Sequence, residues 1–211
     1  MHRLPKMAHI LCVFLFPSWL IIGCAKPHAT LQYETNSLLA AMKDGDLLFR
    51  RGTGFVGHVV TRADSEGLYS HVGIIITKDS SLYIVHAVPH EPDFDGDIDR
   101  VKCENVNSFI RKYPNANLGL YRLDISDSLK AIAAIHALQL SEQQIPFDHA
   151  YNLEDDTAFY CTELIEYVYA QVGISISEGR RTSIFLPGMR GEYIMPSDLT
   201  KCSKLKPVVC Q

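Results

Sequence analysis

The sequence lacks the features that mark several large classes of protein. Beyond its N-terminal apolar run it has no second stretch long enough to span a membrane, and it has no internal repeat. Lysine and arginine form no basic stripe and the net charge is −4, which argues against a nucleic-acid partner. The glycine-rich segment 51–57 lacks the Gly-Lys-Ser/Thr ending of a phosphate loop. Nucleic-acid and nucleotide binding are therefore not indicated.

Metal-binding patterns are also missing. The cysteines include no Cys-x-x-Cys pair of the kind that structural zinc sites use. Segment 89–100 alternates carboxylates around Gly96, but its spacing departs from that of a calcium-binding EF-hand. We interpret it as a solvated loop and predict no metal and no other cofactor. Among the cysteines left without another role, Cys202 and Cys210 form the favoured disulfide pair.

The N-terminus is organised like a bacterial export signal. Arg3 and Lys6 precede a largely apolar run of 15 residues, 8–22, which suits a signal peptide better than a spanning helix of about 20 residues. The run ends in Ile21-Ile22-Gly23-Cys24, which resembles a lipoprotein lipobox. The resemblance implies a lipid anchor on Cys24 and, because alanine follows, sorting to the outer membrane. A plain cleaved signal or a signal anchor is the alternative.

The remaining residues are numerous enough for one domain with its own core. We expect a signal peptide at 1–23, a tether at 24–36 and the domain at 37–211. Apolar, β-branched runs predict strands at 45–50, 70–77, 82–88 and 118–123. A helix is predicted from Ser126 or Asp127 to about Gln143, with an inward stripe that includes Ile132 and Ile135. This order indicates an α+β fold.

Cys161 occupies a position that favours nucleophilic chemistry. It falls in the first turn of a predicted amphipathic helix whose apolar residues include Leu164, Ile165 and Val168. The positive end of a helix dipole favours a thiolate, so we expect a lowered pKa for Cys161. The alternative is an inert cysteine packed in the core as a small hydrophobic residue.

Two histidines on neighbouring strands offer a base for this thiol. His71 lies near the start of one predicted strand and His86 near the end of the next, and these ends are adjacent in an antiparallel hairpin. A lone histidine in an apolar strand is more often a satisfied core residue. When two histidines lie together beside a cysteine at a helix start, we give a catalytic role the same weight as a structural one.

Three further residues complete the candidate site. The backbone N–H of Cys161 is a natural oxyanion donor, and Tyr160 is a second candidate donor. Ser70, next to His71, is a candidate for substrate binding. Asp148 is a third candidate, because it can accept a hydrogen bond that organises the loop before the cysteine helix.

The order of these motifs resembles that of the YiiX/YaeF-like permuted NlpC-type cysteine peptidases. The resemblance spans about residues 43–173 and rests on Gly45-Asp46-Leu47-Leu48-Phe49, Ser70-His71-Val72-Gly73-Ile74, Tyr83-Ile84-Val85-His86-Ala87 and Phe159-Tyr160-Cys161-Thr162-Glu163-Leu164-Ile165. It implies a circularly permuted papain-like fold, with an antiparallel sheet or small barrel packed against helices. It also implies that Cys161 is the nucleophile, His71 the general base and acid, and His86 the residue that orients His71. Many relatives carry glutamate at this third position, so His86 departs from the pattern.

The same resemblance implies a thiol hydrolase of the cell envelope, anchored by lipid and facing the periplasm. Its expected substrates are amide bonds of short or cell-wall-derived peptides. The lecithin retinol acyltransferase family shares the histidine-first order, so an acyltransferase or lipase is the alternative. A binding module that keeps the fold without turnover is the third possibility.

Overall fold

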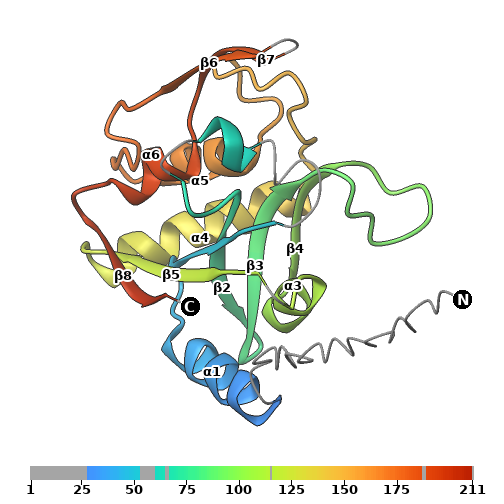
Figure 1. Ribbon diagram of the computed structural model, residues 1–211, viewed down its shortest axis with the longest axis vertical. Helices are drawn as coiled ribbons and strands as arrows, with labels where there is room; N and C mark the ends of the chain where they lie inside the picture. Colours follow the sequence, from blue (N-terminus) through green and yellow to red (C-terminus); the bar gives the residue numbers. More distant parts are fainter. Residues whose placement is uncertain (1–27, 53–59, 65–66, 115, 187–188, 211) are drawn as a thin grey trace, which may run out of the picture.

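The fold is built on one open antiparallel sheet, seen in the computed structural model of Figure 1. The structure describes residues 28–52, 60–64, 67–114, 116–186 and 189–210. Six strands pair in the order β4-β3-β2-β1-β5-β8, and a separate two-stranded sheet joins β6 to β7. All of these pairings are antiparallel. The α+β prediction is confirmed, and the small-barrel alternative is wrong because β4 and β8 do not pair with each other.

The elements follow the sequence-based prediction closely in the middle of the chain. The strands are β1 (Leu47–Arg50), β2 (His71–Lys78), β3 (Ser81–Val88), β4 (Arg100–Asn105), β5 (Leu118–Leu123), β6 (Thr182–Leu186), β7 (Met189–Tyr193) and β8 (Leu205–Cys210). The helices are α1 (His28–Ala41), α3 (Val106–Lys112), α4 (Asp127–Glu142), α5 (Cys161–Ala170) and α6 (Pro196–Thr200). Helix α1 starts inside the range predicted as a tether. None of the described helices is long and apolar enough to cross a membrane. The predicted signal peptide and Cys24 lie outside the described residues.

Side chains alternate along the strands and give the sheet two buried faces. One face packs against α4 and α5 and includes Leu47, Val72, Ile74, Val85 and Ala87. The opposite face packs against α1 and α3 and includes Leu48, Ile75, Ile84 and Leu120. Because both faces are covered, the central strands are almost continuously apolar, as the sequence shows.

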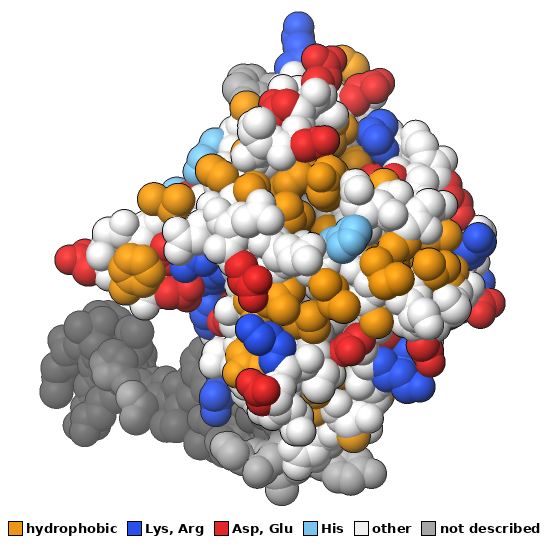
Figure 2. All heavy atoms as spheres, turned by 180° about the vertical axis from the view of Figure 1, so that it is seen from behind, with side chains coloured by type: hydrophobic (Ala, Val, Ile, Leu, Met, Phe, Trp, Pro, Cys, Tyr) orange, Lys and Arg blue, Asp and Glu red, His pale blue; other side chains and the backbone are white. Residues whose placement is uncertain are grey.

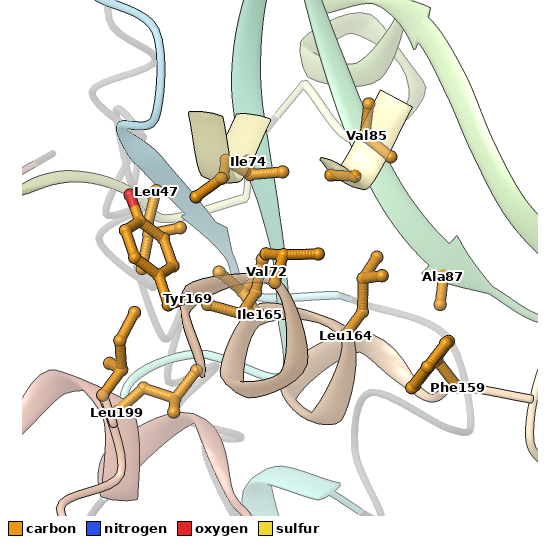
Figure 3. Packing of buried hydrophobic residues seen from close by; sticks show 14 of the residues in the cluster. Leu47, Val72, Ile74, Val85, Ala87, Phe159, Leu164, Ile165, Tyr169 and Leu199 are labelled. Atoms are coloured by element: carbon orange, nitrogen blue, oxygen red, sulfur yellow. The ribbon is translucent and has the colours of Figure 1, made fainter. Parts of the chain in front are cut away.

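Helix α5 is fixed to the sheet by its apolar side chains. Leu164, Ile165, Val168 and Tyr169 are fully buried, and burying a side chain of this kind contributes about 1.5–3 kcal/mol. Figure 3 shows Leu164 and Ile165 pointing from α5 toward Val72 and Ile74 of β2. The Tyr169 hydroxyl also donates a hydrogen bond to the carbonyl of Gly45. These contacts determine where the first residue of α5, Cys161, is placed.

The predicted inward stripe of α4 is partly wrong. Ile132 and Ile135 are 41% and 47% exposed, while Ala133, Ala134 and Ala137 are fully buried. Alanines on the inner face let the helix approach the sheet closely, so the larger residues lie at its flanks. Exposed hydrophobic side chains lie among charged and polar ones on the face of the molecule shown in Figure 2.

The predicted disulfide between Cys202 and Cys210 does not form. Cys202 is a free thiol whose sulfur lies 3.5 Å from a carboxylate oxygen of Glu178. Cys210 is the last residue of β8, where its backbone pairs with Gly119.

Candidate active site

A cavity collects residues from both halves of the chain. Its empty volume is about 510 Å³, part of it open to solvent. Ser70 and His71 enter it from the start of β2, and Cys161 enters from the start of α5. The remaining lining residues are mostly apolar or aromatic: Val60, Ala87, Pro89, Phe147, Tyr151, Tyr160, Thr162, Tyr193, Ile194, Met195 and Pro196.

Cys161 is the first residue of α5, as the sequence predicts. Tyr160, in an extended conformation, forms the N-cap, and its backbone N–H donates to Glu163 Oε2 at 3.2 Å. The sulfur of Cys161 is contacted by backbone N–H groups of Val72, Thr162 and Cys161 itself. The nucleophile candidate thus lies at a helix start and directly beside the strand that carries His71.

The site favours the protonated thiol of Cys161, and not the thiolate that the sequence led us to expect. Burial raises the pKa of Cys161 to about 11, and the three backbone N–H groups reduce the increase without cancelling it. The prediction of a lowered pKa is therefore wrong, because loss of water disfavours the thiolate more than the helix start favours it. In the free protein the thiol is protonated, and its reaction requires a base.

The two predicted histidines contact each other. His71 Nε2 lies 2.9 Å from His86 Nδ1, and both rings contact Phe109 of α3. This confirms that they share one face of the sheet, the face toward α3. His71 nevertheless reaches the cavity, because it is the first residue of β2.

His86 also contacts the carboxylate of Glu104, a residue that the sequence did not point to. Its Nε2 lies 2.9 Å from Glu104 Oε1, and Lys112 Nζ lies 2.8 Å from the same oxygen. Burial would raise the pKa of Glu104, but the bonds from His86 and Lys112 outweigh it and lower that pKa to about 2. The β3–β4 register of the structure places His86 opposite Lys102, so Glu104 lies two residues further along the same face.

Burial, with a contribution from the positive charge of Arg50, favours the neutral form of both histidines. Arg50 lies directly opposite His71 in the β1–β2 register, and its guanidinium is stacked on Phe109, 4.1 Å from the ring centre. Burial lowers the pKa of His71 well below its ordinary value, and the positive charge of Arg50 lowers it further. Burial also lowers the pKa of His86, although Glu104 acts in the opposite direction. At neutral pH, His71 is therefore available as a base.

Tyr160 and Ser70 both line the cavity, as expected of candidate site residues. The Tyr160 hydroxyl accepts the backbone N–H of Ile194 at 3.0 Å, which leaves its own proton to donate. Thr162 donates to the carbonyl of the same Ile194, so the start of α5 holds this segment from both sides. Ser70 Oγ accepts the backbone N–H of Gly52 at 2.8 Å.

Asp148 has the organising contact predicted for it but does not line the cavity. Its carboxylate accepts backbone N–H groups of Ala150, at 2.7 Å, and of Asn152. These bonds enclose Tyr151, a cavity residue that sequence reasoning missed. Tyr151 has a φ of 54°, a left-handed conformation that is costly for a tyrosine. Burial, followed by the nearby Cys161, raises the pKa of Tyr151 to about 12.

The pKa of Cys161 leads to a testable alkylation profile. We expect the rate of alkylation of Cys161 by iodoacetamide to keep rising from about pH 7 to about pH 10, because the thiolate fraction grows throughout this range. Peptide mapping by mass spectrometry separates Cys161 from Cys103 and Cys202. A rate that levels off below about pH 7 would instead reveal a preformed thiolate–imidazolium pair.

Comparison with known proteins agrees with this arrangement. Residues 41–206 match the family of the permuted papain-like amidase enzyme, YaeF/YiiX, C92 family. The fold is similar to the crystal structure of metalloprotein YiiX from Escherichia coli O157:H7, with a TM-score of 0.65 and 17% identity over 80% of this chain and 97% of that chain. No protein of curated function is significantly similar.

The description of that neighbour as a metalloprotein finds no counterpart in the part of the chain described here. Its residues contain no group of three or more His, Cys, Asp or Glu side chains arranged to hold a metal ion. The family match extends over most of the sequence and includes both histidine strands and the cysteine helix. This protein belongs to the permuted papain-like amidase family, a family of cysteine peptidases and amidases.

Proposed function

We propose that this protein hydrolyses amide bonds of short or cell-wall-derived peptides, with Cys161 as nucleophile and His71 as base. The observation that supports the proposal is that both residues, which come from opposite halves of the chain, line one cavity. Because His71 Nε2 is engaged with His86, the other ring nitrogen, Nδ1, is left to act on the thiol. His86 is the residue that orients the ring.

The reaction follows from these contacts. As the sulfur of Cys161 attacks the acyl carbonyl, His71 takes the thiol proton, and the resulting imidazolium later gives it to the leaving amine. Water then hydrolyses the acyl-enzyme, with His71 as base. The oxyanion receives hydrogen bonds from the backbone N–H of Cys161 and from the Tyr160 hydroxyl. Each such donor is typically worth about 3 kcal/mol.

A second candidate function is favoured by the apolar lining of the cavity. The described lining residues include no lysine, arginine, aspartate or glutamate, so a charged substrate group would lose its hydration there without an ionic partner. Phe147, Tyr193 and Met195 suit an apolar acyl group instead. Acyl transfer or lipid hydrolysis of the lecithin retinol acyltransferase type is therefore the alternative.

We also propose that the enzyme is a lipoprotein of the cell envelope. The lipobox-like sequence Ile21-Ile22-Gly23-Cys24 supports this, and an outer-membrane anchor would hold the domain in the periplasm near cell-wall peptides. A peptide of the envelope and the membrane itself would be its partners.

Removal of the sulfur tests the proposed reaction. We expect Cys161→Ala to reduce turnover by about four orders of magnitude while the thermal unfolding midpoint stays close to that of the wild type. His71→Ala is expected to be nearly as damaging, and His86→Ala less so. Cys103→Ala, which removes a thiol outside the cavity, is the matched control. A Cys161→Ala variant with wild-type activity would refute the proposal.

A product-release assay separates the two candidate substrates. Purified enzyme is incubated with peptidoglycan fragments, with N-acyl amides of increasing chain length, and with acyl lipids. The amidase proposal predicts release of free amine from peptide fragments that present an apolar residue to the cavity. Activity confined to acyl lipids would favour the alternative, and activity on neither in the wild type would favour a binding module.

The anchor is tested on full-length protein expressed in a bacterial host. We expect wild-type protein in the membrane fraction, with mass spectrometry showing an acylated N-terminal Cys24. The Cys24→Ser variant should lose the acyl group and leave this fraction after washing. Wild-type protein whose N-terminal residue is unmodified and is not Cys24 would contradict the lipoprotein assignment.

A further inference from the structure

A chain of hydrogen bonds leads from the cavity into the protein and ends at a carboxylate. His71 Nε2 contacts His86 Nδ1 at 2.9 Å, and His86 Nε2 contacts Glu104 Oε1 at 2.9 Å. His86 is fully buried, so each of its ring nitrogens has one protein partner. Glu104 lies at the other end, where it lines an open cleft with Glu91, Lys112 and others.

The carboxylate determines the direction of every bond in this chain. An ionised carboxylate can only accept, so His86 Nε2 must carry the hydrogen and donate it to Glu104. A neutral His86 then has an unprotonated Nδ1, which can only accept from His71. His71 must therefore carry its hydrogen on Nε2, and its Nδ1 is left with the basic lone pair.

We propose that Glu104 is a positioning residue that fixes the tautomers of both histidines and thereby directs the basic nitrogen of His71 toward Cys161. The inference rests on the proposed function and deepens it. Because His86 occupies the position that orients His71, the carboxylate does not contact His71 itself. It contacts His86 instead, and it comes from β4. Glu104 is not among the residues that line the cavity, and it acts through its contact with His86.

The charges around the chain of bonds support this direction. Lys112, from α3, lies 2.8 Å from Glu104 and keeps it ionised. Arg50, from β1, faces both histidines and disfavours a second positive charge there. Glu91, from the loop after β3, binds Arg50 at 3.0 Å and Lys112 at 2.9 Å. On the cavity side, the titratable side chains that line the same cavity as His71 are those of Cys161, Tyr151, Tyr160 and Tyr193. The ionised end of the chain is therefore Glu104, and both imidazoles are neutral at rest.

Glu104→Gln tests the proposal, because glutamine has a similar shape but no charge and can donate as well as accept. We expect kcat to fall by about 10- to 100-fold with little change in KM. The acid limb of the kcat/KM profile should move to lower pH, since Glu104 favours the protonated form of the histidine pair. Glu91→Gln is the matched control: it removes a charge from the same cluster without breaking a bond to histidine, and a clearly smaller effect is expected.

Nuclear magnetic resonance of the ring nitrogens gives a second, independent readout. Correlation spectra of ¹⁵N-labelled protein at neutral pH should show His71 and His86 each protonated at Nε2. Glu104→Gln should populate the Nδ1-protonated form. If Glu104→Gln fails to fold, the wild-type spectrum still tests the proposal, because a hydrogen on Nδ1 of either ring overturns it. Wild-type kcat and pH profile in Glu104→Gln, or equal losses in Glu91→Gln, also overturn it.

These outcomes are separable from failure of the proposed function. The tautomers are read in the inactive Cys161→Ala variant as well as in the wild type, so they do not depend on turnover. Full activity of Cys161→Ala would refute the hydrolytic mechanism and leave the tautomer assignment standing. The reverse result, an inactive Cys161→Ala variant with His71 protonated on Nδ1, would refute only the role of Glu104.

Discussion

The packing of α5 against β2 is the contact on which the candidate site depends. Leu164 and Ile165 are buried against the sheet one turn after Cys161, and the sulfur lies beside the backbone N–H of Val72. Successive residues of an α-helix are rotated by about 100°. A slip of one position would therefore turn the sulfur away from the cavity while exposing the apolar face. The hydrophobic contacts that stabilise the domain also orient its candidate nucleophile.

Exclusion of water determines the protonation state of the site. Burial raises the pKa of Cys161 and lowers the pKa of His71, so both groups are neutral in the resting protein. The carboxylate of Glu104 contacts His86, which in turn contacts His71, and it is paired with Lys112. In the proposed reaction, charge develops only as the thiol reacts, when preorganised donors are in place to receive it.

The amino-acid sequence predicts well what depends on local pattern. Hydrophobic periodicity locates the strands and the start of α5 at Cys161, and strand order brings His71 near His86. It predicts poorly what depends on close packing between elements. The exposed Ile132 reflects how near alanines let α4 approach the sheet, and the raised pKa of Cys161 reflects tertiary burial. Glu104 emerges only once the β3–β4 register is known, because a shift of one residue would place it on the other face.

The order of the elements along the chain determines when the two candidate catalytic residues come together. His71 belongs to the sheet and Cys161 to a helix 90 positions later, and neither segment carries both groups. The unfolded polypeptide therefore contains only an ordinary cysteine and an ordinary histidine at these positions. If these two residues act as proposed, the reactive pair forms only when the two halves of the chain dock, so folding itself switches the site on.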